Sequence, residues 1–364
     1  EGAEHVFWQK FAAQNVKSAV LFMTALGIYD VSVNGKDVQE QYFAPGYTYY
    51  PRDLFYQKMD VTDAIHNGEN ILKVYLAQGW YCGRFTFDNK IQIYGDQPAV
   101  SWVLQIETMD GRQSEITSSA DVTELTSPYA YAGFYDGEIY DATVMEQEIG
   151  KAVPYTGAVP DHLEETFTKV RLQEEMPVRA VMQREDSTIL DFGQNFAGVI
   201  TIDPGELPEG TTLTIRHGEI LNADGSLYTA NLRKAKAEIV YTSGHEKKIY
   251  IPKFTYMGFR YAELKGAPYH EGMISARALY SEMKRTGYFQ CSNAMVQQLY
   301  ENQVWGQKSN YVEIPTDCPQ RDERMGYTGD GHVYALTGSY NFDTRDFFRK
   351  FLKDIRYSQT DNSE

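Results

Sequence analysis

The sequence predicts a chain of several domains: two β-sandwiches followed by the first helices of an α-helical domain. Three observations support this prediction. Residues 6–149 read as short strands and turns, and residues 187–264 repeat strands at roughly ten-residue spacing, as in β-sandwiches. Apolar residues recur at helical spacing only after about residue 276. A length of 364 residues also allows two or three domains, each with its own core.

The first domain is expected over residues 1–149. Asn34-Gly35 is a hairpin signal after an alternating strand, and Asn67-Gly68 is a tight turn before a buried strand. The strands are expected at Ser18–Thr24, Gly27–Val33, Glu69–Leu76, Pro98–Glu107 and Ser114–Leu125. Trp80 lies in a glycine-flanked aromatic pair, and we expect it to fill the core or pack on the next domain rather than line a ligand site.

The second domain is expected over residues 150–275. The stretch 146–165 before its strands contains two glycines and two prolines, which indicates a linker. Ser187–Ile202 reads as strand, glycine turn and strand, and Phe254–Leu264 as the last strand of the series. Alternating Leu213 and Ile215 indicate a further strand between them.

The helical part is expected over residues 276–364. Ser292 is the predicted N-cap of a first helix, which has Val296, Leu299, Tyr300 and Val304 at helical spacing. His332–Tyr340 is a second helix with Val333, Leu336 and Tyr340 on one face. Asp343 caps a third helix, whose broad apolar stripe (Phe347, Phe348, Phe351, Leu352, Ile355) indicates packing between helices.

Composition excludes several classes of partner. A net charge of −16 argues against nucleic acid and anionic membrane surfaces, and no apolar run reaches the roughly 18 residues of a membrane span. Cys82, Cys291 and Cys318 have neither disulfide nor zinc-site spacing, so we expect free thiols. We expect no metal and no cofactor, and the sequence does not decide the compartment or a structural calcium.

The stretch Ile314–Asp330 is the candidate functional site. Within it lie four carboxylates and two guanidiniums: Asp317, Asp322, Glu323, Asp330, Arg321 and Arg324. Proline and glycine interrupt any regular period, so the stretch reads as a loop, with apolar residues interleaved as in a pocket wall. A carboxyl group among other carboxylates and arginines is suited to protonate a leaving oxygen of a polyhydroxylated substrate. The alternative is an ordinary solvated surface loop.

The run Asp317-Cys-Pro-Gln-Arg-Asp-Glu-Arg324, followed by Gly326-Tyr-Thr-Gly-Asp330, resembles the active-site signature of bacterial α-L-rhamnosidases of glycoside hydrolase family 78. Weaker similarity extends over residues 1–275. Asp60–Leu76 is similar to jelly-roll accessory domains of glycosidases, and Phe254–Leu264 to the strand that closes the second sandwich of the rhamnosidases.

The resemblance implies roles for five residues. Glu323 would be the general acid, Asp317, Arg321 and Asp330 would bind hydroxyls of the rhamnosyl ring, and Tyr327 would stack on the sugar. Family members usually have tryptophan at position 327, so the stacking area is smaller here. Neighbouring carboxylates raise the pKa of Glu323 and the arginines lower it, and burial decides between them.

The resemblance also implies an (α/α)6 toroid of roughly a dozen helices and an inverting mechanism with a second carboxylate as general base. That glutamate would lie C-terminal to Glu364, with the rest of the catalytic domain. We therefore expect this chain to carry the acid without the base and to be inactive alone.

The predicted function is hydrolysis of terminal α-L-rhamnosyl residues from glycosides or polysaccharides. One alternative is a toroid glycosidase for another sugar. A second, of a different class, is a carbohydrate-binding β-sandwich scaffold without catalysis. Aglycone, linkage and oligomeric state are not determined by the sequence.

Overall fold

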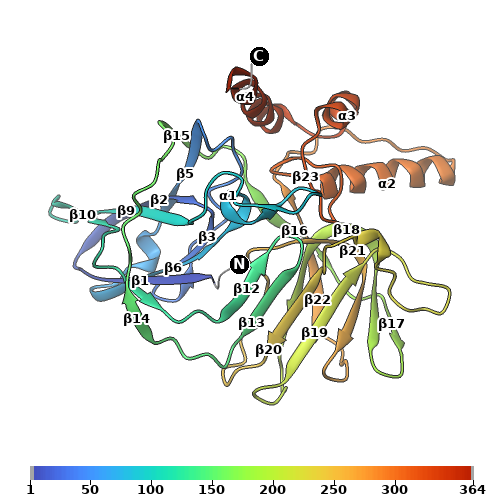
Figure 1. Ribbon diagram of the computed structural model, residues 1–364, viewed down its shortest axis with the longest axis horizontal. Helices are drawn as coiled ribbons and strands as arrows, with labels where there is room; N and C mark the ends of the chain where they lie inside the picture. The colour runs from blue at the N-terminus through green and yellow to red at the C-terminus, as the bar shows by residue number, and fades with distance from the viewer. Residues whose placement is uncertain (1–3, 362–364) are drawn as a thin grey trace. The chain divides into compact units, whose positions relative to one another are not determined.

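The computed structural model describes residues 4–361, which form two compact units (Figure 1). Unit 1 contains the chain up to Arg84, Ile91–Gly133 and Val144–Thr166. Unit 2 contains Phe85–Lys90, Phe134–Thr143 and the chain from Phe167 onward. The units therefore interleave along the sequence, whereas the expected domains (residues 1–149, 150–275 and 276–364) follow one another. The three-domain division stays a prediction.

Unit 1 is a sandwich of two sheets, as expected for the first domain. Their strand orders are β14-β11-β1-β6-β3-β4 and β10-β9-β2-β5-β15. The strands of the first sheet are β1 (His5–Ala13), β3 (Ile28–Val33), β4 (Lys36–Asp37), β6 (Gly68–Ala77), β11 (Thr123–Leu125) and β14 (Glu148–Lys151). Those of the second are β2 (Val16–Leu26), β5 (Asp53–Asp60), β9 (Ala99–Thr108), β10 (Gln113–Thr117) and β15 (His162–Glu165). The expected linker at 146–165 thus contains two of these strands.

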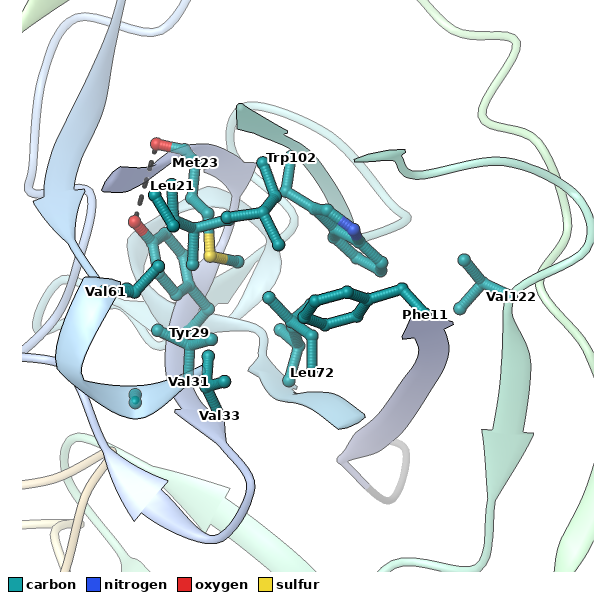
Figure 2. Packing of buried hydrophobic residues seen from close by; sticks show 14 of the residues in the cluster. Phe11, Leu21, Met23, Tyr29, Val31, Val33, Val61, Leu72, Trp102 and Val122 are labelled. Carbon is teal, nitrogen blue, oxygen red and sulfur yellow. Dashed lines mark hydrogen bonds between the residues drawn. The ribbon is translucent and has the colours of Figure 1, made fainter. Parts of the chain in front are cut away.

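Alternating apolar residues of both sheets form the core of unit 1. Figure 2 shows Phe11 and Leu72 from one sheet and Leu21 and Trp102 from the other pointing into a common interior. A fully buried leucine such as Leu21, with 0% exposure, contributes about 1.5–3 kcal/mol. The Tyr29 hydroxyl donates to the Met23 carbonyl oxygen across 3.4 Å, so this buried hydroxyl is hydrogen-bonded within the core.

The remaining elements of unit 1 include two predicted features. Asn34 and Gly35, at φ 53° and 75°, make the expected turn between β3 and β4. Trp80 in α1 (Gly79–Cys82) is buried and packs edge-on against Phe43 and Tyr47, so it serves core packing. The other elements are η1 (Thr62–Ala64) and β12 (Tyr129–Gly133), and the chain crosses between units in β7 (Arg84–Phe85) and β8 (Lys90–Ile91).

Unit 2 contains one large sheet, where two stacked sheets were expected. Its hydrogen-bonded order is β13-β20-β19-β21-β18-β22-β16, with β17 on β18. The strands are β13 (Gly137–Asp141), β16 (Val170–Met176), β17 (Ala180–Gln183), β18 (Thr188–Ile202), β19 (Thr212–Gly218), β20 (Glu238–Thr242), β21 (Met257–Lys265) and β22 (Ile274–Ser281). A 3₁₀ turn, η2 (Ala230–Leu232), lies between β19 and β20.

Two strands of this sheet differ from the sequence expectation. The predicted strand, turn and strand at 187–202 is one strand, β18, with a bulge between Asp191 and Phe196 where Gly193 takes φ 76°. Strand β22 was not predicted, although it pairs with both β18 and β16. The residues around the bulge are held by Asp191, which accepts two hydrogen bonds of 2.9 Å from Arg260.

The three predicted helices are present after the sheet, as α2 (Ala294–Asn310), α3 (Thr328–Asn341) and α4 (Arg345–Asp361) (Figure 1). Helix α2 contacts β18 and β22, and the Ser309 hydroxyl accepts the backbone N–H of Ala197 at 3.1 Å. The short strands β23 (Tyr311–Val312) and β24 (Ile314–Pro315) follow it. None of the helices in residues 4–361 is long and apolar enough to cross a membrane.

Details of these helices correct the sequence prediction. The N-cap of α2 is Asn293, not Ser292: its side chain accepts the backbone N–H groups of Met295 and Val296. The apolar residues that were predicted on one face of α3 are exposed, Val333 at 81% and Leu336 at 67%. In α4 the stripe is divided, since Phe347 and Phe351 are buried but Leu352 is exposed.

Candidate active site

The charged stretch is a loop between β24 and the N-terminus of α3, as predicted. The loop closes on itself through Asp317. The Asp317 backbone N–H donates to the Met325 carbonyl oxygen at 3.1 Å, and the Met325 N–H donates back to Asp317 Oδ1 at 2.9 Å. One oxygen of the Asp317 carboxylate is therefore used to hold the loop.

Arg324 connects the loop to backbone segments next to the sheet. Its side chain is buried, and Nη1 donates to the carbonyl oxygens of Phe134 at 2.8 Å and Tyr256 at 2.6 Å. The guanidinium also lies over the rings of Tyr135 and Tyr256. The φ of Arg324 is 51°, a left-handed conformation that is costly for a non-glycine residue, so these contacts hold the turn against that strain.

Gly258 of β21 allows the loop to approach the sheet this closely. A Cβ atom there would lie 2.7 Å from Pro319 Cγ and 2.9 Å from Gln320 Cβ. Both distances are shorter than carbon atoms tolerate without displacement. The absence of a side chain at position 258 is therefore part of how the sheet positions the loop.

Glu323 is enclosed by hydrogen-bond donors. Tyr327 donates to Oε1 at 3.0 Å, while Arg321 Nη2 and Arg233 Nη1 contact Oε2 at 3.0 and 2.9 Å. The Tyr135 hydroxyl donates to the Glu323 backbone carbonyl at 2.7 Å. With 12% of its side chain exposed, Glu323 points toward these partners and away from bulk water.

Opposing effects act on the protonation of Glu323. Burial alone would raise the pKa of its carboxyl, but the Tyr327 hydrogen bond and the charges of Arg321 and Arg233 outweigh it and hold the pKa below its ordinary value. In the absence of substrate, Glu323 is therefore ionised near neutral pH. Burial and the nearby carboxylate raise the pKa of Tyr327 to about 12, so its hydroxyl stays a donor.

The loop brings four of the five predicted site residues into one contact network. Arg321 links Glu323 to Asp317, whose Oδ2 lies 3.4 Å from Arg321 Nη2. Tyr327 joins this network through its hydroxyl. Asp330 stands apart in the first turn of α3, and its side chain makes no hydrogen bond to any described residue.

Asp330 and Asp317 instead share a pocket between α2 and α3. The pocket has a volume of about 270 Å³ and is lined mainly by amide, hydroxyl and carboxylate side chains. Its wall contains Gln303, Gln307, Asn310, Tyr311, Thr316 and Tyr334 besides the two aspartates. Such a lining matches a ligand with several hydroxyl groups.

Some residues near Glu323 were not among the predicted site residues. Asp322 was excluded from the predicted catalytic residues; it is buried and accepts a long hydrogen bond of 3.4 Å from Asn89. Arg233 was missed, because it lies ninety residues before Glu323 in the chain and nothing local marks it. Asn195, Glu219 and Asn231, which hydrogen-bond to one another, also lie far from the loop in the sequence and were not predicted.

Within residues 4–361, two groups of side chains have metal-ligating atoms within 4.8 Å of one another: Asp317, Cys318 and Glu323, and Asp53, His162 and Glu164. In the first group burial raises the pKa of the Cys318 thiol to about 11, so the free thiol is protonated. The carboxylates of this group already have protein donors. All three cysteines are free thiols, as predicted.

Three protein-family models match successive stretches of the chain. The α-L-rhamnosidase N-terminal domain matches residues 14–181, the bacterial α-L-rhamnosidase concanavalin-like domain matches 182–280, and the bacterial α-L-rhamnosidase 6 hairpin glycosidase domain matches 284–364. A sheet scaffold followed by a match to a six-hairpin glycosidase domain is the domain order of this class of protein. The chain belongs to the bacterial α-L-rhamnosidase family.

Individual relatives agree with this assignment. An α-L-rhamnosidase of Streptomyces avermitilis is 36% identical over 364 residues, which covers 95% of this chain and 35% of that protein. One of Formosa agariphila is 35% identical over 370 residues, covering 96% and 40%. The chain thus spans less than half the length of these relatives.

Solved structures match the fold closely. The crystal structure of the Streptomyces avermitilis α-L-rhamnosidase complexed with L-rhamnose has a TM-score of 0.93 at 35% identity and covers 98% of this chain and 36% of that one. The α-L-rhamnosidase of Aspergillus terreus has a TM-score of 0.91 at 35% identity and covers 99% and 44%. The predicted order of β-sheet domains followed by a few helices is therefore confirmed.

Proposed function

We propose that the protein is an exo-acting α-L-rhamnosidase that inverts the anomeric configuration and uses Glu323 as general acid. The enclosed carboxyl of Glu323 at the centre of the charged loop is the observation that carries this proposal. Hydrolysis breaks the bond between the anomeric carbon and the glycosidic oxygen. That oxygen takes the proton of Glu323, and water adds to the carbon and gives its proton to a second carboxylate.

The other loop residues have supporting roles in this proposal. Asp317, Arg321 and Asp330 bind hydroxyls of the rhamnosyl ring, which agrees with the polar pocket that the two aspartates line. Tyr327 holds Glu323 by its hydroxyl and stacks its ring on the sugar. No metal or cofactor is needed, because both carboxylates and water suffice.

Glu323 must be protonated when it donates. Its contacts with two guanidiniums oppose protonation in the free protein. We infer that bound substrate excludes water from Glu323 and displaces at least one guanidinium. Burial then dominates and raises the pKa toward the value that an acid catalyst needs.

The helices α2–α4 are proposed to begin an (α/α)6 toroid. The apolar residues that α2 and α3 expose, among them Leu299, Val333 and Leu336, support this, because further helices would cover them. The general base would come from those further helices.

The test is rhamnose release from an aryl α-L-rhamnoside by the protein at its natural full length. We expect Glu323→Gln to lower kcat by about 10²–10⁴-fold, because the leaving oxygen loses its proton donor. Glu185→Gln, a change on an exposed turn of the same unit, is the matched control and should have no effect. An unchanged rate in Glu323→Gln contradicts the role of Glu323. A panel of aryl glycosides tests the sugar: preference for another glycoside contradicts the rhamnosidase proposal.

A further inference from the structure

Four polar side chains of the sheet region converge beside Glu323 from three separate segments. We call them the Arg233 cluster: Asn195, Glu219, Asn231 and Arg233. Asn195 Nδ2 and Asn231 Nδ2 donate to the two oxygens of Glu219 at 2.9 and 3.0 Å. Arg233 follows Asn231 by two residues and contacts Glu323, so the chain connects the cluster to the acid at Arg233.

We propose that the Arg233 cluster is the binding subsite for the leaving group and that it takes a hydroxyl-rich group, that is, a sugar. This inference rests on the proposed function, because it requires Glu323 to protonate the glycosidic oxygen. It adds the part of the substrate that lies beyond that oxygen.

The position of the cluster follows from the chemistry of the acid. The proton of Glu323 goes to the oxygen that leaves with the second half of the substrate. That half must therefore lie against groups that touch Glu323 from outside the charged loop. Among the described residues outside the loop, Arg233 contacts the carboxylate itself: its Nη1 lies 2.9 Å from Glu323 Oε2, and it comes from the loop after η2.

The backbone holds these side chains in place. Asn195 lies in the bulge of β18, and bulges turn a side chain away from the regular direction of its strand. Arg233 has φ 56°, a left-handed conformation that is uncommon for a residue with a side chain. Glu219 ties both segments together, since each of its oxygens accepts one amide.

The free hydrogen-bonding groups of the cluster define the ligand. The Arg233 side chain is 44% exposed, and only its Nη1 contacts a partner among residues 4–361. The remaining N–H groups can donate to hydroxyl oxygens, as can the exposed side chain of Asn195. The cluster contains no aromatic side chain. It therefore favours a leaving group with several hydroxyls over a flat aryl group, which needs a ring to stack on.

The same contact explains how binding could activate the acid. When a hydroxyl takes the place of the Glu323 carboxylate at Arg233, Glu323 loses one of its two cationic neighbours. Tyr327, Arg321, Asp317 and Cys318 remain around it. Binding of the leaving group and protonation of Glu323 are thus coupled through Arg233.

The experiment compares a rhamnosyl-glucose disaccharide with an aryl α-L-rhamnoside on the protein at its natural full length. We expect Asn195→Ala and Arg233→Gln to lower kcat/KM for the disaccharide about tenfold or more, and the aryl rhamnoside clearly less. The loss with Asn195→Ala should lie in KM. Arg233→Lys, which keeps a cation, should recover part of the activity. Lys234→Gln, a change at the exposed neighbour, is the control and should alter neither substrate.

Thermal unfolding identifies variants that fail to fold, and Asn195→Ala is the safest because that side chain is exposed. Equal losses on both substrates, or no loss on the disaccharide, would overturn the subsite. If the unmodified protein released rhamnose from neither substrate, the proposed function itself would fail. The two failures are therefore distinguishable.

Discussion

Arg324 is the residue on which the shape of the charged loop most depends. Its guanidinium donates to four backbone carbonyl oxygens, of Phe134, Tyr256, Arg321 and Gln320, from a buried position. A lysine ammonium keeps the charge but lacks the planar fork that reaches carbonyls on several sides. The structural role of Arg324 is thus specific to arginine.

We expect Arg324→Lys to lower the free energy of unfolding by about 3 kcal/mol, because several buried acceptors lose their donor. Hydrolysis should fall as well, since Glu323 is the preceding residue. Urea unfolding monitored by tryptophan fluorescence measures the first effect. Arg349→Lys, on the exposed face of α4, is the matched control. Equal stability of the two variants contradicts the proposed role of Arg324.

Glu138 gives the stability of unit 2 a pH dependence. Burial raises the pKa of its carboxyl to about 7, although hydrogen bonds from Tyr250 and from the backbone N–H groups of Phe254 and Lys253 lower it in part. The folded state therefore keeps this proton to higher pH than the unfolded state, whose ordinary value is 4.5. The resulting stabilisation is complete below about pH 4.5 and is lost as the pH rises toward 7.

Glu138→Gln mimics the protonated carboxyl and should remove this dependence. Between pH 4.5 and 7 the free energy of unfolding of the wild type should fall by roughly 3 kcal/mol relative to that of the variant. His217 acts in the opposite direction, since burial lowers the pKa of its imidazole to about 4. Because His217 is present in both proteins, its effect cancels in the difference between their free energies of unfolding. A difference that stays constant with pH would refute the assignment to Glu138.

At the scale of single residues, the sequence predicted the site residues that are close together in the chain. The run from Asp317 to Tyr327 marked Glu323 and its neighbour Arg321, and the structure brings both into contact. Arg233 and Glu219 could not be predicted, because they reach the loop only through the folding of a distant part of the sheet. Nor did composition indicate which arginine of the loop is buried.

At the scale of elements, the N-terminus of α2 offers a direct comparison between prediction and structure. Ser292 and Asn293 are both good N-cap residues, and the apolar spacing that follows does not distinguish a start one residue apart. The structure chooses Asn293, whose Oδ1 accepts the N–H of Met295 at 3.0 Å and of Val296 at 3.2 Å.

We therefore expect Asn293→Ala to destabilise the protein by about 1 kcal/mol, the usual value for loss of a cap. Ser292→Ala, one residue away, is the matched control and should be within about 0.5 kcal/mol of the wild type. Thermal unfolding by circular dichroism measures both. If Ser292→Ala were the more damaging change, the sequence-based assignment would be right after all.

The sheet shows why other elements escaped prediction. The glycine in β18 looked like the end of one strand and the start of another, but it lies at a bulge inside one strand. Strand β22 falls where helical spacing was expected to begin, and its apolar run is short. Short apolar runs do not distinguish strand from helix by periodicity. The bulge has functional weight in our proposal, since it carries Asn195.

At the scale of the whole molecule, the interleaving of the two units could not be read from the sequence. Phe85–Lys90 and Phe134–Thr143 belong with the later part of the chain. Phe134 provides one of the carbonyls that hold Arg324, and Tyr135 binds the backbone of Glu323. The segments that support the loop therefore lie far from it in the sequence.

The position of the second catalytic carboxylate is also a question for the whole molecule. An inverting glycosidase separates its two carboxyl groups by about 6.5–9.5 Å to leave room for water. The carboxylate of Asp317 lies within 4.8 Å of that of Glu323 and is already tied to Met325, so it does not meet this requirement. Asp322 is buried, and its Oδ1 has no partner among residues 4–361. Because the carboxylate is not exposed, it has no access to water.

We therefore expect the 364-residue chain alone to release rhamnose from an aryl rhamnoside at least about 10²-fold more slowly than the natural full-length protein, because in our proposal it carries the acid and the general base belongs to the rest of the catalytic domain. Circular dichroism establishes that the shorter chain is folded, and full-length Glu323→Gln gives the rate expected when the acid alone is lost. A rate for the 364-residue chain within tenfold of the full-length protein would place the base inside residues 1–364. Asp330, whose carboxylate faces the pocket without a partner among the described residues, would then be the first candidate.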